Sequence, residues 1–407
     1  MNKRTLPGLF IALACSAAGA DIVVGGSGAS CAEDPACFNR IHSDITPVAT
    51  AKPGERIVFH GRDAGDLYLN PDEITSADAS PRLGLGVVHP LAGPVHIAGA
   101  KAGDVLAVTL EALSPGPVGW TMASPGGFAG DLVASESLFI TWRLNDKYAE
   151  SDALPGVRIP NASFPGVITT LPGPAELQEM LAREQQLADA GGVVLTPDPE
   201  FAEPAALCGE EGTRATECLR TIPPREHGGN MDIRYVQVGT TVYLPCFIDG
   251  CGLAAGDFHF AQGDGEVSGT AIEMDGVLTV TTRIVRDRPD LSRGPHYEGP
   301  ARVLDIPSES FYATTGFPLK TRGAVPREID YLASAKVAGL SNLSKDINLA
   351  ARNALASMID YIVAEYGYSR SQAYIIASVA VDLRIAQLVD TPNVGVTAIL
   401  PLDIFIK

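Results

Sequence analysis

Residues 277–284 read Val-Leu-Thr-Val-Thr-Thr-Arg-Ile, and the order of side chains in this stretch decides the fold class. Its even-numbered positions, from Leu278 to Ile284, are mostly apolar, while the odd-numbered positions include two threonines and an arginine. Side chains on a strand point to opposite faces in turn, so this alternation predicts a strand with one face in the core.

The same alternation recurs upstream, at residues 105–110, 139–144 and 235–244. Strand patterns of this kind dominate from residue 39 to residue 305. We therefore expect residues 39–305 to form one β-rich region that also holds the candidate site. The predicted fold class is mainly β, sandwich-like or barrel-like.

Helical patterns appear in three places. One helix is predicted at 174–190, and a second at 347–363, where apolar residues fall at helical spacing and Gly367 supplies a stop. A third begins at Ser369, which can form a capping box with Gln372. The last two helices are adjacent in the chain.

The C-terminal region, residues 306–407, is thus predicted to be an α+β portion packed on the same body. Residues 394–405 are expected to form closing strands. Asp382 and Arg384 interrupt the apolar pattern after the last helix, and a solvated edge is the predicted explanation.

The N-terminus resembles a secretion signal. Two basic residues precede the apolar run 6–14, and Ala18-Gly19-Ala20 is a small-residue cleavage site. Residues 1–20 are therefore predicted to be a signal peptide, with a flexible leader at 21–38 and an exported protein, periplasmic or extracellular. Lipid anchoring through Cys15 is the alternative, although the usual leucine three positions ahead is missing.

Removal of that signal leaves six cysteines in three close pairs. In an oxidising compartment these spacings favour local disulfides, although sequence alone allows fifteen connectivities. The predicted pairs are Cys31 with Cys37, Cys208 with Cys218, and Cys246 with Cys251.

The formal net charge of -18 argues against a nucleic acid partner, because binding to nucleic acid depends on Lys and Arg that neutralise phosphates. An acidic surface also repels anionic lipid, and no membrane contact is expected after signal removal.

Polar residues that could act in catalysis or bind a metal are concentrated at residues 229–234 and 256–266. Glycines in the second segment let its backbone approach a ligand closely. His259 with Asp257 or Asp264, together with Asp232, would form a nitrogen and oxygen ligand set for a divalent metal such as zinc or calcium. An ordinary Gly-Asp-Gly turn remains the alternative interpretation.

These segments resemble the acetamidase/formamidase family. The similarity spans nearly all of the mature chain in order, although the secretion signal, the cysteines and the insert around Cys208 to Cys218 depart from the pattern. It is carried by Asn39 to Asp44, Arg62-Asp63-Ala64, His89 to Pro94, Phe164 to Ile168, Gly229 to Asp232, Val242 to Pro245, Gly256 to His259, Gln262 to Glu266 and Gly269 to Glu273.

The resemblance implies hydrolysis of short aliphatic amides, with release of ammonia, on a mostly β scaffold that assembles into homo-oligomers. In our working hypothesis Asp232, His259 and Asp257 hold the metal, and Glu266 relays a proton to the leaving ammonia, so that Glu266, His259 and Asp264 are the predicted catalytic residues.

Three further residues are predicted to bind the substrate: Asn230, Gln262 and His89. Side-chain amides suit a neutral amide ligand, which offers one acceptor and two donors. Distant polar residues can join the site only if the fold brings them to the same cleft, and this applies to His42, Asp63, His89 and His96.

Two rival interpretations stay open at this point. The first is catalysis by a nucleophilic serine or cysteine. The sequence contains no Gly-x-Ser-x-Gly elbow for a serine, and Cys246 or Cys251 could act only if reduced. A non-catalytic protein that binds a small ligand on the same β scaffold is the second, because a fold alone does not decide function.

Overall fold

The computed structural model describes most of the chain beyond residue 19. The predicted signal peptide lies outside the described residues except for Ala20. The described ranges are 20–67, 84–123, 127–128, 130–133, 137–189, 194–287, 295–305, 308, 311–316, 346–387 and 395–406.

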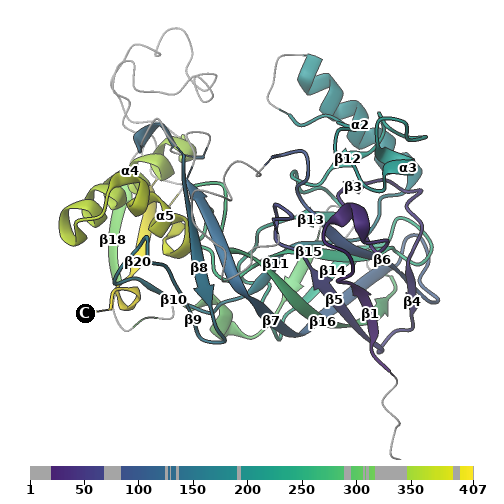
Figure 1. The fold of residues 1–407 in the computed structure, drawn as a ribbon, viewed down its shortest axis with the longest axis horizontal. Coiled ribbons are helices and arrows are strands. Elements are labelled where there is room, and N and C mark those ends of the chain that lie inside the picture. The colour runs from purple at the N-terminus through teal and green to yellow at the C-terminus, as the bar shows by residue number, and fades with distance from the viewer. Residues whose placement is uncertain are drawn as a thin grey trace, which may run out of the picture.

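Most of the strands belong to one mainly antiparallel sheet of fifteen strands (Figure 1). Its central path runs in the order β10-β9-β8-β7-β16-β15-β11-β13. The strands are β1 (Ile22–Gly25), β2 (Cys37–Phe38), β4 (Ala49–Ala51), β5 (Arg56–Gly61), β6 (Leu91–Ile97), β7 (Val105–Ala123), β8 (Leu138–Leu144), β9 (Tyr148–Glu150), β10 (Arg158–Pro160), β11 (Phe164–Thr169), β13 (Gly228–Asn230), β14 (Thr241–Pro245), β15 (Leu253–His259), β16 (Glu273–Val285) and β17 (His296–Glu298).

The remaining elements flank this sheet. Two short strands, β3 and β12, pair with each other, and β18, β20 and β19 form a C-terminal sheet in that order. Their bounds, with those of the helices, are β3 (Arg40–Ile41), β12 (Leu219–Arg220), β18 (Phe311–Gly316), β19 (Asp382–Gln387), β20 (Gly395–Pro401), α2 (Pro174–Asp189), α3 (Ala205–Cys208), α4 (Ile347–Tyr366), α5 (Arg370–Ala380), η1 (Cys31–Glu33), η3 (Gly130–Leu132), η5 (Ala301–Leu304) and η7 (Leu402–Ile404).

The mainly β class with two adjacent C-terminal helices is confirmed. Gly367 ends α4 in the left-handed conformation, with φ of 75°, and Ser369 and Gln372 form the predicted capping box at the start of α5. Figure 1 shows α4, α5, β18 and β20 at one end of the long axis, with α2 and α3 toward the other. No helix among the described residues is both long and apolar enough to cross a membrane.

The C-terminal helices share one hydrophobic core with the sheet. Buried Met358 and Tyr374 from α4 and α5 belong to the same cluster as Trp142 and Phe258 from β8 and β15. Burial of large side chains from both regions against one another stabilises their mutual arrangement.

The predicted flexible leader is wrong for residues 22–25, because β1 pairs in parallel with β5. Gly25, the last residue of β1, has φ of 81°, and a Cβ there would lie 2.8 Å from the carbonyl oxygen of His60. Glycine is needed here because a side chain would prevent this close approach, so the glycine does not mark a flexible linker. All three predicted disulfides are present: Cys31–Cys37, Cys208–Cys218 and Cys246–Cys251.

Two further predictions need correction. The predicted strand 235–244 forms only as β14, because a turn at Gln237–Thr240, with Gly239 at φ of 93°, precedes it. Asp382 is buried and not solvated, since it forms ion pairs with Arg234 and Arg384. The predicted closing strands at 394–405 form as β20, and η7 follows.

Candidate active site

Two neighbouring strands bring the first three polar side chains together. Asp257 and His259 are two residues apart in β15 and therefore project from the same face. Glu273, the first residue of β16, lies directly opposite His259 in the strand register. His259 Nε2 lies 3.1 Å from Glu273 Oε2 and 3.4 Å from Asp257 Oδ1. All three side chains are almost fully buried.

A second group surrounds the same imidazole. Asp232 follows β13 by two residues, and Glu266 lies in the loop between β15 and β16. Each residue of the trio Asp232, His259 and Glu266 offers one ligand atom within 4.8 Å of the others, and the trio Asp257, His259 and Glu273 does the same. His259 therefore belongs to both groups.

These residues line a cavity of about 230 Å³. His89 also reaches it, with Nε2 3.8 Å from Asp257 Oδ2. The full lining is Ala64, Gly84, Leu85, Val88, His89, Trp120, Met122, Ile222, Asn230, Asp232, Asp257, His259, Glu266, Gly269, Thr270 and Glu273.

The backbone around the cavity is unusually constrained. Asp232, Asp257 and Glu266 adopt φ of 48°, 53° and 42°, a left-handed region that non-glycine residues seldom occupy. Such conformations persist where the surrounding structure holds them, and they concentrate at functional sites. In the adjacent strand β11, a Cβ on Gly166 would lie within 2.8 Å of Asp257, His259 and Asp232 side-chain atoms. The absence of a side chain at Gly166 allows the acids and the imidazole to meet.

Burial is the largest influence on the pKa values of the four acids, Asp232, Asp257, Glu266 and Glu273. Desolvation raises the pKa of Asp232 to about 8 and that of Glu273 to about 7, and it raises the pKa of Glu266 well above its usual value. Burial acts in the same direction on Asp257, but the charges of His89 and His259 outweigh it and hold the Asp257 pKa below its usual range. Four carboxylates this close, two of them buried and two partly buried, require protons or a bound cation to balance their charge.

The orientation of the His259 ring favours the binding of a cation. The Nε2 group of Gln262 donates to the carbonyl oxygen of Asp232 at 2.8 Å, so its Oε1 faces His259 Nδ1 at 3.0 Å. His259 Nδ1 therefore donates. Burial lowers the pKa of His259, but the charges of Glu273 and Asp257 outweigh it and raise this pKa well above its usual value, so a bound cation would take the place of the Nε2 proton. Asp257 Oδ1, Glu273 Oε2 and Asp232 Oδ1 are buried without hydrogen-bond partners. A ring nitrogen and several unpartnered carboxylate oxygens form a suitable ligand set for a divalent metal, with Gln262 fixing the ring orientation.

Helix α5 holds the loop that carries Glu266. The backbone nitrogen of Gly263 donates to the carbonyl oxygen of Ser378 at 2.8 Å, and that of Ser268 donates to Ser378 Oγ at 3.1 Å. Ser378 Oγ in turn donates to the carbonyl oxygen of Thr270 at 2.7 Å, and Tyr374 Oη donates to that of Val267. The position of Glu266 thus depends on a helix more than 100 residues further along the chain.

The structure brings together most of the residues predicted for the site. Asn230, Asp232, Asp257, His259, Glu266 and His89 all line the cavity. Gln262 does not line it, and both ends of its amide are bonded within the protein, so it positions His259 in place of the predicted substrate contact.

Asp264 lies outside the cavity lining, where it accepts a hydrogen bond from Tyr235 Oη. Among the distant candidates, Asp63 supports the lining residue Trp120 by accepting from its Nε1 at 2.9 Å. His42 lies beside Asp44 and Glu217, and His96 beside Gly250, so neither joins the site. Sequence reasoning gave no role to Glu273, although strand pairing with β15 places it against His259.

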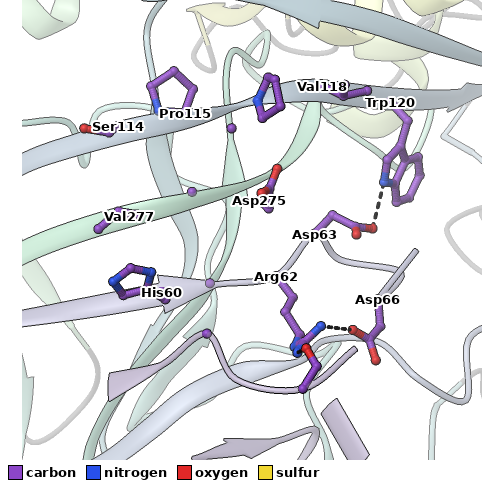
Figure 2. A pocket seen from close by; sticks show the side chains of 16 residues that line it. His60, Arg62, Asp63, Asp66, Ser114, Pro115, Val118, Trp120, Asp275 and Val277 are labelled. Atoms are coloured by element: carbon purple, nitrogen blue, oxygen red, sulfur yellow. Dashed lines mark hydrogen bonds and ion pairs between the residues drawn. The ribbon is translucent and has the colours of Figure 1, made fainter. Parts of the chain in front are cut away.

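A larger cavity of about 620 Å³, whose lining also includes Trp120, is shown in Figure 2. Its polar lining residues include His60, Asp275 and Arg62, which is paired with Asp66. Both metal-compatible groups found among the described residues belong to the smaller cavity. We therefore assign the chemistry to the smaller cavity.

His227, next to β13, gives a prediction about acid stability. It is fully buried, and its Nδ1 lies 2.7 Å from Thr169 Oγ1. Burial, with a contribution from Arg225, lowers its pKa to about 3. The unfolded chain takes up this proton near pH 6.5, so the contribution is present above that pH and is lost as pH falls from about 6.5 to 3.

We expect the free energy of unfolding to fall by several kcal/mol over this window, at about 1.4 kcal/mol per unit of pKa shift. His227→Asn retains a group able to bond Thr169 but cannot titrate, so its unfolding free energy should depend less on pH. Urea unfolding of both proteins at pH 7, 5 and 4 measures the difference. Parallel pH dependence in the two proteins would contradict the assignment.

A buried imidazole among four acids, beside apolar lining residues such as Trp120 and Met122, has the composition of a hydrolase active site. Comparison with known proteins defines the family: the chain belongs to the Acetamidase/Formamidase family, whose model matches residues 27–407.

Individual relatives agree. The chain is 31% identical to a formamidase of Methylophilus methylotrophus, with 92% of this chain and 90% of the relative covered. It is 30% identical to an acetamidase of Mycolicibacterium smegmatis, with 83% and 84% covered. Among solved structures, a gamma lactamase from Delftia acidovorans superposes with a TM-score of 0.82 at 28% identity, with 95% and 93% of the chains covered.

Proposed function

We propose that this amidase cleaves the C–N bond of small linear amides, to carboxylate and ammonia, in the cavity around His259. The family and the formamidase and acetamidase relatives support the reaction type. The observation that carries the location is the convergence of His259 Nε2 with unpartnered oxygens of Asp257, Glu273 and Asp232.

The chemistry of these side chains suits amide hydrolysis. An amide carbonyl needs an activated nucleophile, stabilisation of the developing oxyanion, and a proton for the departing nitrogen. The groups Asp232, His259, Glu266 and Asp257, His259, Glu273 could hold a divalent cation such as zinc or calcium. Such a cation, when bound, supplies positive charge that polarises a carbonyl and lowers the pKa of water.

Protein side chains account for the remaining steps. Burial and the charge of Asp232 raise the pKa of Glu266, which favours its protonated form. If the group Asp257, His259 and Glu273 holds the cation, Glu266 can deliver this proton to the leaving nitrogen. Asn230 donates through Nδ2 to Asp232 Oδ2 at 2.8 Å, which leaves its unpartnered Oδ1 to accept a hydrogen bond from the substrate N–H. His89, with Nδ1 unpartnered, can bond a second polar atom of the substrate.

Chelation tests the metal part of this proposal. After exhaustive dialysis against a chelator, we expect kcat for acetamide to fall by at least about 100-fold, the scale on which loss of one transition-state-stabilising group lowers kcat. Activity should return on addition of one divalent cation. Metal content measured by mass spectrometry is the control, and full activity in protein shown to be metal-free would contradict the proposal.

A nucleophilic cysteine has little support, because Cys246 and Cys251 form a disulfide. The binding-protein alternative remains testable by ammonia release across formamide, acetamide and propionamide. Tight binding of these amides without ammonia release would favour it.

Export is part of the same proposal. The basic and then apolar pattern of residues 1–20 and three disulfides, which persist in oxidising compartments, support it. We also propose a homo-oligomer, which the family resemblance implies. Protein recovered from the periplasm or medium should begin at about Asp21 by N-terminal sequencing, and retention of the uncleaved chain in the cytoplasm would contradict export.

A further inference from the structure

The lining of the cavity contains two chemically different sets of residues. The histidines, acids and Asn230 form the polar set. The apolar set, which we call the apolar wall, consists of Ala64, Leu85, Val88, Trp120, Met122 and Ile222. Leu85 is 64% exposed and lies at the mouth, whereas Ala64, Val88 and Trp120 are buried. A ligand in this cavity would therefore have a polar head at the acids and an apolar body against the wall.

The cavity is larger than the smallest amides. Its volume of about 230 Å³ corresponds to about eight water-sized groups, at about 30 Å³ for each water in the liquid. Formamide has three non-hydrogen atoms and acetamide four, so each would leave much of the apolar wall in contact with water. Apolar surface left against water gains no hydrophobic stabilisation.

The apolar wall is fixed in place at Trp120 and Met122. The Trp120 indole donates from Nε1 to Asp63 and stacks on Phe139, with ring centroids 5.4 Å apart, and Figure 2 shows the Asp63 contact from the neighbouring cavity. Met122 is held through its backbone, since its nitrogen donates to Thr270 Oγ1 at 2.9 Å and its carbonyl oxygen accepts from Ser268 Oγ at 2.9 Å. A wall held in this way cannot readily close onto a smaller ligand.

We infer that the preferred substrates are primary amides with a hydrocarbon acyl group of about four to six carbons, whose chain packs on the apolar wall. This inference rests on the proposed amide hydrolysis in the same cavity. Isovaleramide is a suitable probe because it has seven non-hydrogen atoms and a branched chain.

The expected effect follows from the apolar contact. Each methylene buried in the transition state raises kcat/KM by about fourfold, the equivalent of about 0.8 kcal/mol. Isovaleramide has three more carbons than acetamide, so we expect its kcat/KM to be about 60-fold higher. The measurement is initial ammonia release by the holoenzyme with formamide, acetamide, butyramide and isovaleramide.

Filling the cavity tests whether the wall causes the preference. Ile222→Trp adds bulk at a lining position, and we expect the ratio of kcat/KM for isovaleramide to that for acetamide to fall at least 10-fold. Ile385→Trp is the matched control, because Ile385 is 59% exposed and outside the cavity lining, and its ratio should equal that of the wild type. Ala64→Leu provides an independent filling variant if Ile222→Trp does not fold.

The outcomes separate this inference from the proposed function. A wild-type preference for formamide or acetamide over isovaleramide, or a substrate ratio unchanged in both filling variants, would overturn the inference and leave amide hydrolysis intact. Failure to release ammonia from any of the four amides would overturn the proposed function, and the inference with it.

Discussion

Replacement of His259 by glutamine is expected to lower kcat/KM for amide hydrolysis by about 10³-fold or more, the range associated with loss of a catalytic acid, base or charge-stabilising group. His259 is shared by both groups of potential metal ligands, so its loss affects both. Glutamine keeps a polar side chain in this buried position but cannot place a ring nitrogen between Glu273 and Asp257.

The readouts for this variant are steady-state ammonia release, metal content and the thermal unfolding midpoint. His60→Gln is the matched control, because His60 lies on β5 and lines only the larger cavity. We expect the control to change activity by less than about twofold, as surface and peripheral substitutions usually have small effects. Activity of His259→Gln within 10-fold of the wild type would refute the central role of this imidazole.

Substitution of Gly166 by alanine is the second change with a large expected effect. A Cβ at this position would lie 2.6 Å from Asp257 Oδ2, 2.7 Å from His259 Cε1 and 2.8 Å from Asp232 Oδ1. These distances are too short for real contacts, so the three side chains must move. A displacement of about 1 Å at a catalytic site can lower the rate by about 100-fold, and we expect a loss of at least this size in kcat.

Gly54→Ala is the control for the cost of changing a glycine. Gly54 has φ of 86° and no atom within 4 Å of an added Cβ, so alanine there strains the backbone without touching the site. It should lower the unfolding midpoint and leave kcat unchanged. Equal kcat in Gly166→Ala and the wild type would show that the three side chains do not need their close approach.

Sequence reasoning succeeded where the deciding interactions are local. The capping box of Ser369 and Gln372 and the stop at Gly367 each depend on residues within one helical turn. The three disulfides join cysteines 5, 6 and 10 residues apart, within reach of spacing arguments. Asp257 and His259, grouped as candidate metal ligands, are likewise only two residues apart.

It failed where distant pairing decides the outcome. Glu273 joins the site because β16 pairs with β15 in one register, and Asp382 is buried because Arg234, 148 positions earlier, neutralises it. The sequence shows neither the register nor the ion pair. The apolar wall combines residues from positions 64 to 222 and carries no local signal.

Because α5 holds the Glu266 loop, the active site can form only late in the synthesis of the chain. Gly263 and Ser268 obtain their hydrogen-bond partner only when Ser378 has been made and α5 has docked. Until then, an emerging chain carries every acid and histidine of the cluster but has no scaffold to organise Glu266. The chain should therefore hydrolyse amides only after α5 has been made and has docked. A partly synthesised chain would be inactive toward amides in the compartment where it is made.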